Sequence, residues 1–169
     1  MLKLLKKLIT EGSERDPSKR YAVTLINDAP ASYYSGMLPG AVAALYRNEE
    51  IMIQMSPLAV WSCAEYIEQA VERIDGDASK VYLVNGESVD YDVLALNVGS
   101  RTLGADEAPG VWEHSLTTRP INDLLPKINA KEQDLKERGI VPVVAVCGGG
   151  AAGTELSFAF KKRWSDYFG

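Results

Sequence analysis

The chain has 169 residues, of which 46% are hydrophobic and 24% are charged, and it carries a formal net charge of -5 at pH 7. This composition is typical of a soluble globular protein with one ordinary domain. It offers no basic stripe for a nucleic acid, and no apolar run approaches the roughly 20 residues that a membrane span needs.

Cysteine and histidine are scarce, because the sequence holds only two cysteines and one histidine. Cys63 and Cys147 stand far apart and belong to no CxxC pair. We therefore expect both to be buried apolar side chains in a reducing compartment, which would be the cytoplasm or an organelle. So few soft ligands predict no metal cluster, and His114 is interpreted as an ordinary loop residue.

The first ten residues, MLKLLKKLIT, place leucines and lysines on opposite faces of a predicted helix. Such a helix would pack on a sheet, and it could also lie on a membrane surface or begin a transit peptide. The packed helix is favoured because the segment has only about three turns and contains no arginine.

The first predicted strand, residues 21–26, ends at Asn27 and Asp28. Helix, loop and strand follow one another here as in the second half of a βαβ unit. An acidic side chain just past such a strand can bind the ribose hydroxyls of an adenosine, although Asn-Asp is also a common turn. The strand and glycine turn that open such a unit would lie before Met1, so we expect the chain to begin late within the unit.

The loop at residues 32–40, SYYSGMLPG, alternates large apolar side chains with serine, glycine and proline. Such a segment can lay backbone N–H groups and a flat apolar surface against a planar ligand. A compact loop packed under a helix fits the composition nearly as well. The elements expected next are a helix at 41–46, a strand at 51–55, and a helix at 58–64 begun by Ser56 and Pro57.

A period of two begins at Tyr66 and continues to Ile74, as in a partly exposed strand. Residues 80–84 and 88–96 then flank Asn85-Gly86, which is a strong hairpin signal. These three strands predict an antiparallel meander inserted between parallel elements. Its apolar last strand is expected to enter the main sheet and to end in the sequence NVGSR.

A long helix is predicted from about Thr118 to Arg138, kinked near Pro126 and capped by Gly139. The apolar run 141–147 follows at once and reads as a strand. The helix and this strand lead the chain to its glycine cluster.

The pattern Gly148-x-Gly150-x-x-Gly153 stands where this strand should turn into a helix. Gly148 would permit the sharp turn, Gly150 would let a pyrophosphate approach the backbone, and Gly153 would let the helix pack closely. The phosphates would face the positive N-terminus of the helix. A glycine-rich turn that binds no ligand is the simpler alternative.

Taken in order, these elements resemble the FAD- and NAD(P)H-binding oxidoreductases of the pyridine nucleotide-disulfide oxidoreductase superfamily. YSGMLPG at 34–40 and RPIND at 119–123 are most similar to NADH dehydrogenase-like flavoproteins, including those fused to selenide, water dikinase. The fold implied is α/β: a partial Rossmann-like FAD-binding domain with an inserted antiparallel β-meander at residues 1–138. The first strand, turn and helix of a second, truncated dinucleotide-binding domain for NAD(P)H would follow at 139–169.

The resemblance also implies which residues hold the cofactors. Asn27 or Asp28 would bind the adenosine ribose of FAD, and the backbone of Val71 would meet the adenine. The others are Ser35, Gly36, Met37 and Pro39 along the flavin, Asn97, Gly99 and Ser100 closing over FAD, and Gly148, Gly150, Gly153 and Glu155 at NAD(P)H.

The activity implied is that of an FAD-dependent NAD(P)H oxidoreductase, which passes a hydride from nicotinamide to flavin and electrons to an acceptor such as a quinone. No CxxxxC pair is present for disulfide reduction, and no catalytic acid or base is assigned. The superfamily's first glycine turn and most of its second dinucleotide domain have no counterpart here. We therefore expect the chain by itself to bind FAD weakly and to show little activity. The alternative is a non-catalytic remnant or an interaction domain.

Overall fold

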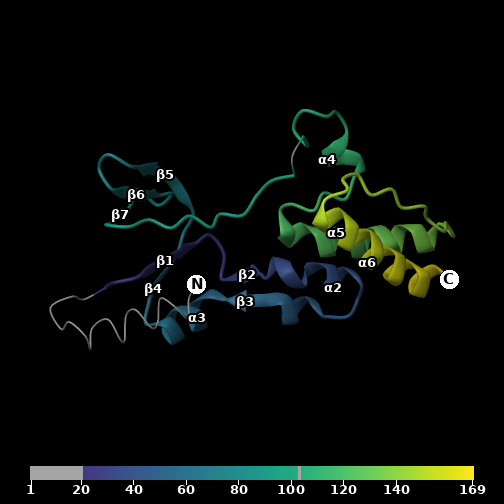
Figure 1. The fold of residues 1–169 in the computed structure, drawn as a ribbon, viewed down its shortest axis with the longest axis horizontal. Coiled ribbons are helices and arrows are strands. Elements are labelled where there is room, and N and C mark those ends of the chain that lie inside the picture. Colours follow the sequence, from purple (N-terminus) through teal and green to yellow (C-terminus); the bar gives the residue numbers. More distant parts are fainter. Residues whose placement is uncertain (1–20, 103) are drawn as a thin grey trace. The chain divides into compact units, whose positions relative to one another are not determined.

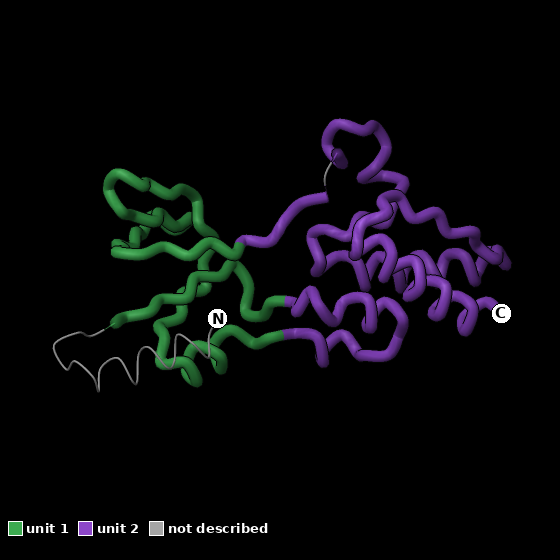
Figure 2. The backbone as a smooth tube through the Cα atoms, in the orientation of Figure 1, with its two compact units in different colours: residues 1–32, 53–97 green, residues 33–52, 98–169 purple. Residues whose placement is uncertain are grey.

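The computed structural model describes residues 21–102 and 104–169 (Figure 1). The helix predicted for the first ten residues lies outside this range. The chain divides into two compact units (Figure 2), unit 1 with Met1–Ser32 and Ile53–Asn97, and unit 2 with Tyr33–Met52 and Val98–Gly169. Helices and strands are mixed, as predicted, while the division at residue 138 stays a prediction.

Unit 1 contains a parallel pair of strands, β1 (Thr24–Asn27) and β4 (Glu65–Glu68). A parallel pair needs a long connection, and helix α3 (Met55–Ser62) lies within it. The residue before α3 is Gln54, so the prediction that Ser56 begins this helix is wrong. Pro57 is tolerated because it falls in the first turn, where its missing N–H has no partner to lose.

The predicted meander is confirmed in β5 (Val71–Asp75), β6 (Lys80–Leu83) and β7 (Ser88–Asp90). Strand β6 pairs antiparallel with both neighbours. The turn between β6 and β7 contains Gly86, whose φ of +88° suits a residue without a Cβ. The single strand predicted across 66–74 is divided in two, because β4 pairs with β1 while β5 pairs with β6.

Unit 2 is mainly helical. A short sheet of β2 (Ala31–Tyr33) and β3 (Met52–Gln54) contains two of the three places where the chain passes from one unit to the other, and the third lies between Asn97 and Val98. The helices are the single turns η1 (Ser35–Met37), η2 (Asn48–Ile51) and α4 (Val111–His114), the short α2 (Leu38–Val42), and the long α5 (Ile121–Glu137) and α6 (Ala151–Phe168).

Helix α5 supplies much of the core of unit 2. Leu124, Ile128 and Leu135 recur at helical spacing and are buried. Pro126 lies inside the helix, and α5 continues past it as one element. The helix ends as predicted at Gly139, which has φ +64° and donates its N–H to the Lys136 carbonyl at 3.1 Å.

The apolar core joins α2, α5 and α6. Helix α2 packs against α6, and it begins at Leu38, earlier than the predicted residue 41. The clustered buried residues are Leu38, Ala41, Val42, Ala43, Ile51, Leu124, Leu125, Ile128, Leu156, Ala159 and Phe160.

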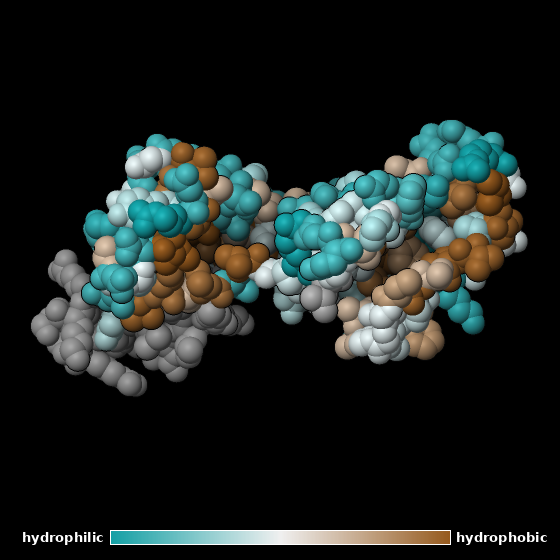
Figure 3. All heavy atoms as spheres, turned by 90° about the horizontal axis from the view of Figure 1, so that it is seen from above, coloured by the Kyte–Doolittle hydropathy of each residue, from teal (hydrophilic) through white to brown (hydrophobic). Residues whose placement is uncertain are grey.

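The prediction is wrong for the end of one strand and for the whole of another. The strand predicted at 88–96 stops with β7 at Asp90, and residues 91–96 and 141–147 lie outside any strand. The side chains of Val93 and Val143 are 88% and 98% exposed. A strand requires a neighbouring strand to accept its hydrogen bonds, and no other segment of the described residues pairs with either run. Apolar side chains therefore remain on the surface (Figure 3).

Both cysteines are also exposed, which corrects the expectation that they are buried. Cys63 follows the last turn of α3 with φ +57°, and Cys147 precedes the glycine cluster. Cys63 thus lies just past the end of α3, which stops at Ser62, and Cys147 ends an apolar run that forms no strand.

Truncation of Ile128 to alanine is expected to lower the free energy of unfolding by about 2–5 kcal/mol, because the side chain is fully buried in unit 2. Urea unfolding followed by tryptophan fluorescence measures this change. The control is Val143→Ala in the same unit, which should stay within about 0.5 kcal/mol because that side chain is exposed. Equal losses in the two variants would contradict the core as described.

Candidate nucleotide-binding site

The turn after β1 is fixed by two hydrogen bonds to one carbonyl. Asn27 donates its side-chain N–H to the Ala29 oxygen at 2.6 Å, and the Tyr66 hydroxyl donates to the same oxygen at 2.9 Å. Burial, with the nearby carboxylates of Glu68 and Asp28, raises the pKa of Tyr66, so its hydroxyl stays a donor. The Asn27 amide is thus engaged in shaping the turn, while Asp28 is exposed at its tip.

The loop predicted to lie along a flavin is held at both ends in unit 2. The Tyr34 N–H donates to the Ile51 carbonyl at 2.8 Å, and the Met37 N–H donates to the Tyr34 carbonyl at 3.0 Å. Met37 also packs against the apolar core. Ser35 and Gly36 between these anchors are exposed, so the loop presents its backbone outward from a fixed base.

The remaining residues predicted to contact FAD lie on exposed parts of the chain. Val71 opens strand β5 and is 43% exposed. Asn97, Gly99 and Ser100 are exposed and follow one another outside any regular element. Gly99 has φ +75°, a conformation that a residue with a Cβ rarely adopts.

The glycine cluster forms a tight turn into α6. Gly148 has φ +117°, and Gly150 precedes the helix with extended backbone. A Cβ built on Gly153 would lie 1.9 Å from the Gly148 carbonyl oxygen, so only glycine permits this approach. The space around Gly149 and Gly150 is open to 4 Å.

This geometry leaves donors at the start of α6. The first intrahelical bond runs from the Thr154 N–H to the Gly150 carbonyl at 3.0 Å. The N–H groups of the preceding turn have no partner within the helix. They carry the positive end of the helix dipole, which suits a phosphate.

The structure gathers the predicted residues into two groups. Unit 2 contains the flavin loop with Gly99 and Ser100, and it also contains the glycine turn with Glu155, which is exposed on the first turns of α6. Unit 1 contains Asn27, Asp28, Val71 and Asn97. Within unit 2 the flavin loop continues into α2, and α2 packs against the helix that the glycine turn begins.

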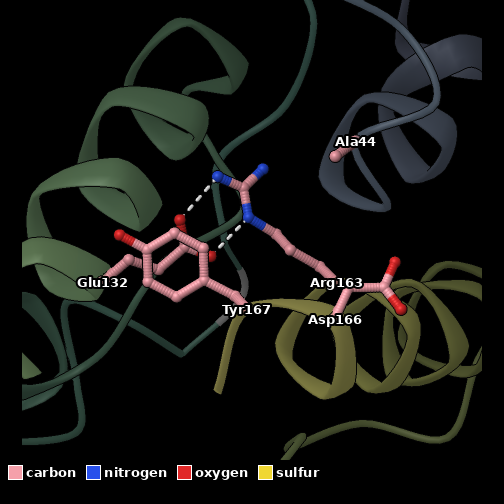
Figure 4. A pocket seen from close by; sticks show the side chains of 5 residues that line it. All are labelled: Ala44, Glu132, Arg163, Asp166 and Tyr167. Carbon is pink, nitrogen blue, oxygen red and sulfur yellow. Dashed lines mark hydrogen bonds and ion pairs between the residues drawn. The ribbon is translucent and has the colours of Figure 1, made fainter. Parts of the chain in front are cut away.

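The sequence interpretation missed a buried ion pair in unit 2. The Arg163 guanidinium binds both carboxylate oxygens of Glu132, and their side chains are only 14% and 4% exposed (Figure 4). Trp164 donates its ring N–H to Glu132 at 2.6 Å. The sequence does indicate that Glu132 is buried, because this residue stands four positions after Ile128 and so lies on the apolar face of α5.

Arg163 has two further acceptors. It donates to the Asn129 side-chain oxygen at 2.7 Å and to the Val42 carbonyl, the last of α2, at 3.4 Å. The guanidinium thus joins α2, α5 and α6. A hollow of about 180 Å³ lies beside it, lined by Ala44, Glu132, Arg163, Asp166 and Tyr167 (Figure 4).

Two threonine hydroxyls in unit 2 are buried and have no hydrogen-bond partner among the residues that the structure describes. They belong to Thr102 and Thr117, and Thr117 is only 4% exposed. Buried hydroxyls normally have a partner. Thr102 follows the predicted FAD contact at Ser100 by two residues, so an added acceptor near this segment would satisfy a donor that the chain itself leaves unpaired.

Within residues 21–102 and 104–169, no helix is long and apolar enough to cross a bilayer, and no three acidic, histidine or cysteine side chains are grouped to hold a metal ion. No protein-family model matches the chain.

A curated relative is the sulfide-quinone reductase of Aquifex aeolicus (strain VF5). It is 26% identical over 137 residues, which are 81% of this chain and 31% of that protein. The crystal structure of the sulfide:quinone oxidoreductase of this bacterium matches with a TM-score of 0.59 and 25% identity, over 79% of this chain and 30% of that one.

Two further solved structures share the fold. NADH:rubredoxin oxidoreductase from Clostridium acetobutylicum matches with a TM-score of 0.53 and 23% identity, over 83% of this chain and 35% of that one. NDH2 from Plasmodium falciparum matches with a TM-score of 0.66 and 20% identity, over 88% of this chain and 35% of that one. The chain thus spans about a third of the length of each relative.

Replacement of Gly153 by alanine is expected to lower the free energy of unfolding by about 1–3 kcal/mol, because the new methyl group would overlap the Gly148 carbonyl. Thermal unfolding measures the effect. Gly149→Ala is the matched control, since a Cβ there meets no atom within 4 Å and the backbone is not left-handed. An unchanged melting temperature for Gly153→Ala would contradict the close turn.

Proposed function

The chain is a relative of the FAD- and NAD(P)H-binding pyridine nucleotide-disulfide oxidoreductases, and we propose that it serves FAD-dependent hydride transfer from NAD(P)H to an acceptor such as a quinone. The observation that carries the proposal is the 26% identity to sulfide-quinone reductase across 81% of the chain. That protein's name gives quinone as the electron acceptor, which makes a quinone the first acceptor to test.

The residues present fit the two nucleotides. The open position at Gly150, which directly precedes the first residues of α6, suits the pyrophosphate of NAD(P)H. The exposed backbone of Ser35 and Gly36 suits the flat flavin, and the unpaired hydroxyl of Thr102 offers a donor near Ser100. The residues proposed at NAD(P)H are Gly148, Gly150 and Gly153 for the pyrophosphate, and Glu155 for the neighbourhood of the nicotinamide.

The adenosine end of FAD would be held by unit 1 residues. Asp28 is proposed for the ribose in preference to Asn27, because the Asn27 amide already binds the Ala29 carbonyl while Asp28 is exposed. The backbone of Val71 is proposed for the adenine, and Asn97 and Gly99 for the segment that covers the cofactor.

When bound, FAD supplies the redox chemistry, taking a hydride from reduced nicotinamide and returning electrons to the acceptor. The chain's own residues bind and orient. The glycine turn places the pyrophosphate at a helix N-terminus, which stabilises its negative charge. The flavin loop, anchored at Tyr34 and Met37, keeps its exposed backbone in one conformation before the ligand arrives, which lowers the entropy cost of binding.

Flavin binding is the first test. The purified chain is titrated with FAD, and flavin fluorescence and the visible spectrum are recorded. Saturable binding with a Kd below about 1 mM is expected, which corresponds to a binding free energy of about −4 kcal/mol. A Kd above this value would contradict the proposal. The loaded chain is then mixed with NADH, NADPH or sulfide before a quinone analogue is added. Bleaching by sulfide alone would identify a different electron donor.

The glycine turn gives a second test. Gly150→Val should lower the melting temperature only slightly, because a Cβ at this position meets nothing within 4 Å, although valine is a poorer helix N-cap than glycine. It should weaken NADH binding by about tenfold or more, since the side chain would fill the approach of the pyrophosphate to the backbone. Calorimetric titration measures the affinity.

Gly149→Val is the matched control, because its surroundings are equally open but the expected pyrophosphate contact is at Gly150. Equal affinity in both variants and the original chain would place the nucleotide elsewhere.

A further inference from the structure

We propose that Arg163 is a positioning residue for the flavin loop, which it holds by fixing the end of α2. This inference rests on the proposed function, because it gives Ser35–Pro39 the role of flavin contact. The observation behind it is the single guanidinium that binds Glu132 and Asn129 of α5 and the last carbonyl of α2 (Figure 4).

Helix α2 needs such a contact because of its length. It has only five residues, and isolated helices of this length are unstable in water. Its apolar residues Leu38, Ala41 and Val42 pack into the core. Apolar contacts are non-directional, so they resist removal of the helix more than its rotation or sliding.

The Arg163 contact supplies direction. The Val42 carbonyl is one of the acceptors that a helix leaves unpaired at its C-terminus, where a cation is also favoured by the helix dipole. The guanidinium is held in one orientation, because two of its N–H groups donate to the buried carboxylate of Glu132. The end of α2 is therefore tied to both long helices of unit 2.

The flavin loop is directly connected to this end of α2. Helix η1, Ser35–Met37, is followed without a break by α2, which begins at Leu38. A shift of α2 is transmitted through two short turns of helix to the exposed backbone at Ser35 and Gly36. Loss of the tie should thus make the loop less ordered before FAD binds, and ordering it then costs affinity.

Arg163→Lys separates this role from charge. The lysine ammonium keeps the positive charge beside Glu132, so the buried carboxylate is still paired. A point charge cannot reproduce the planar fork that reaches Glu132, Asn129 and Val42 together. The hollow of about 180 Å³ beside the side chain leaves room for water around the ammonium.

The experiment compares FAD and NADH affinities of the full chain and of Arg163→Lys, well below the melting temperature. Loss of the 3.4 Å hydrogen bond to the Val42 carbonyl predicts roughly two- to tenfold weaker FAD binding. NADH affinity should not change, because Arg163 lies about three turns further along α6 than Gly153. Amide hydrogen exchange should also become several-fold faster at residues 37–43 in the variant.

Two controls separate positioning from general stability. Arg138→Lys makes the same chemical change at an exposed arginine of unit 2, and neither affinity should change. Trp164→Phe removes one hydrogen-bond donor to Glu132 but leaves the hydrogen bond from Arg163 to α2. It should therefore lower the melting temperature without a selective loss of FAD affinity.

Equal losses of FAD and NADH affinity in Arg163→Lys would overturn the proposal, and so would unchanged hydrogen exchange at residues 37–43. If the original chain binds no FAD, the proposed function fails while the exchange measurement still decides whether Arg163 orders this segment. Faster exchange spread over all of unit 2 would show a structural role only.

Discussion

The buried carboxylate of Glu132 constrains unit 2 more than any other polar group of the described chain. Its two oxygens accept hydrogen bonds from Arg163 and from Trp164, both on α6. A buried charge without partners costs several kcal/mol, so α5 and α6 are held in the register that satisfies it. The apolar core between these helices permits neighbouring registers far more readily, because burial depends on area and not on direction.

Local signals in the sequence predicted much of the secondary structure. The meander follows from alternating strands around Asn85-Gly86, and the end of α5 follows from Gly139, because each depends on a few adjacent residues. The start of α6 after the glycine cluster was predictable for the same reason. Strand β1, Thr24–Asn27, overlaps the strand predicted at 21–26 but begins three residues later and ends one residue later.

Features that depend on a distant partner were not predictable in the same way. The runs at 91–97 and 140–147 have the apolar composition of strands, but composition does not provide the neighbouring strand that a ladder requires. Glu132 was missed because a glutamate on a helix is usually solvated, and its burial depends on Arg163, which is 31 positions away. The sequence pattern by itself indicated the glycine turn, the Asn27-Asp28 pair and the loop at 32–40, whereas the roles of Val71, Asn97, Gly99 and Ser100 came only from the resemblance.

In unit 2, the features that would bind a nucleotide differ from those that would position it. The glycine turn is a local structure, since the approach of the Gly148 carbonyl to Gly153 and the free N–H groups of α6 need no paired strand before them. The proposed pyrophosphate contact at this turn therefore does not require residues 140–147 to form a strand. The position of the flavin loop relative to that turn depends instead on longer-range contacts, namely the packing of α2 against α6 and the hydrogen bonds of Arg163. Hydride transfer requires both nucleotides at a short, fixed distance. Under the proposed function, binding would thus depend on backbone geometry near Gly150, while the distance between the reacting groups would depend on side chains near the other end of α6.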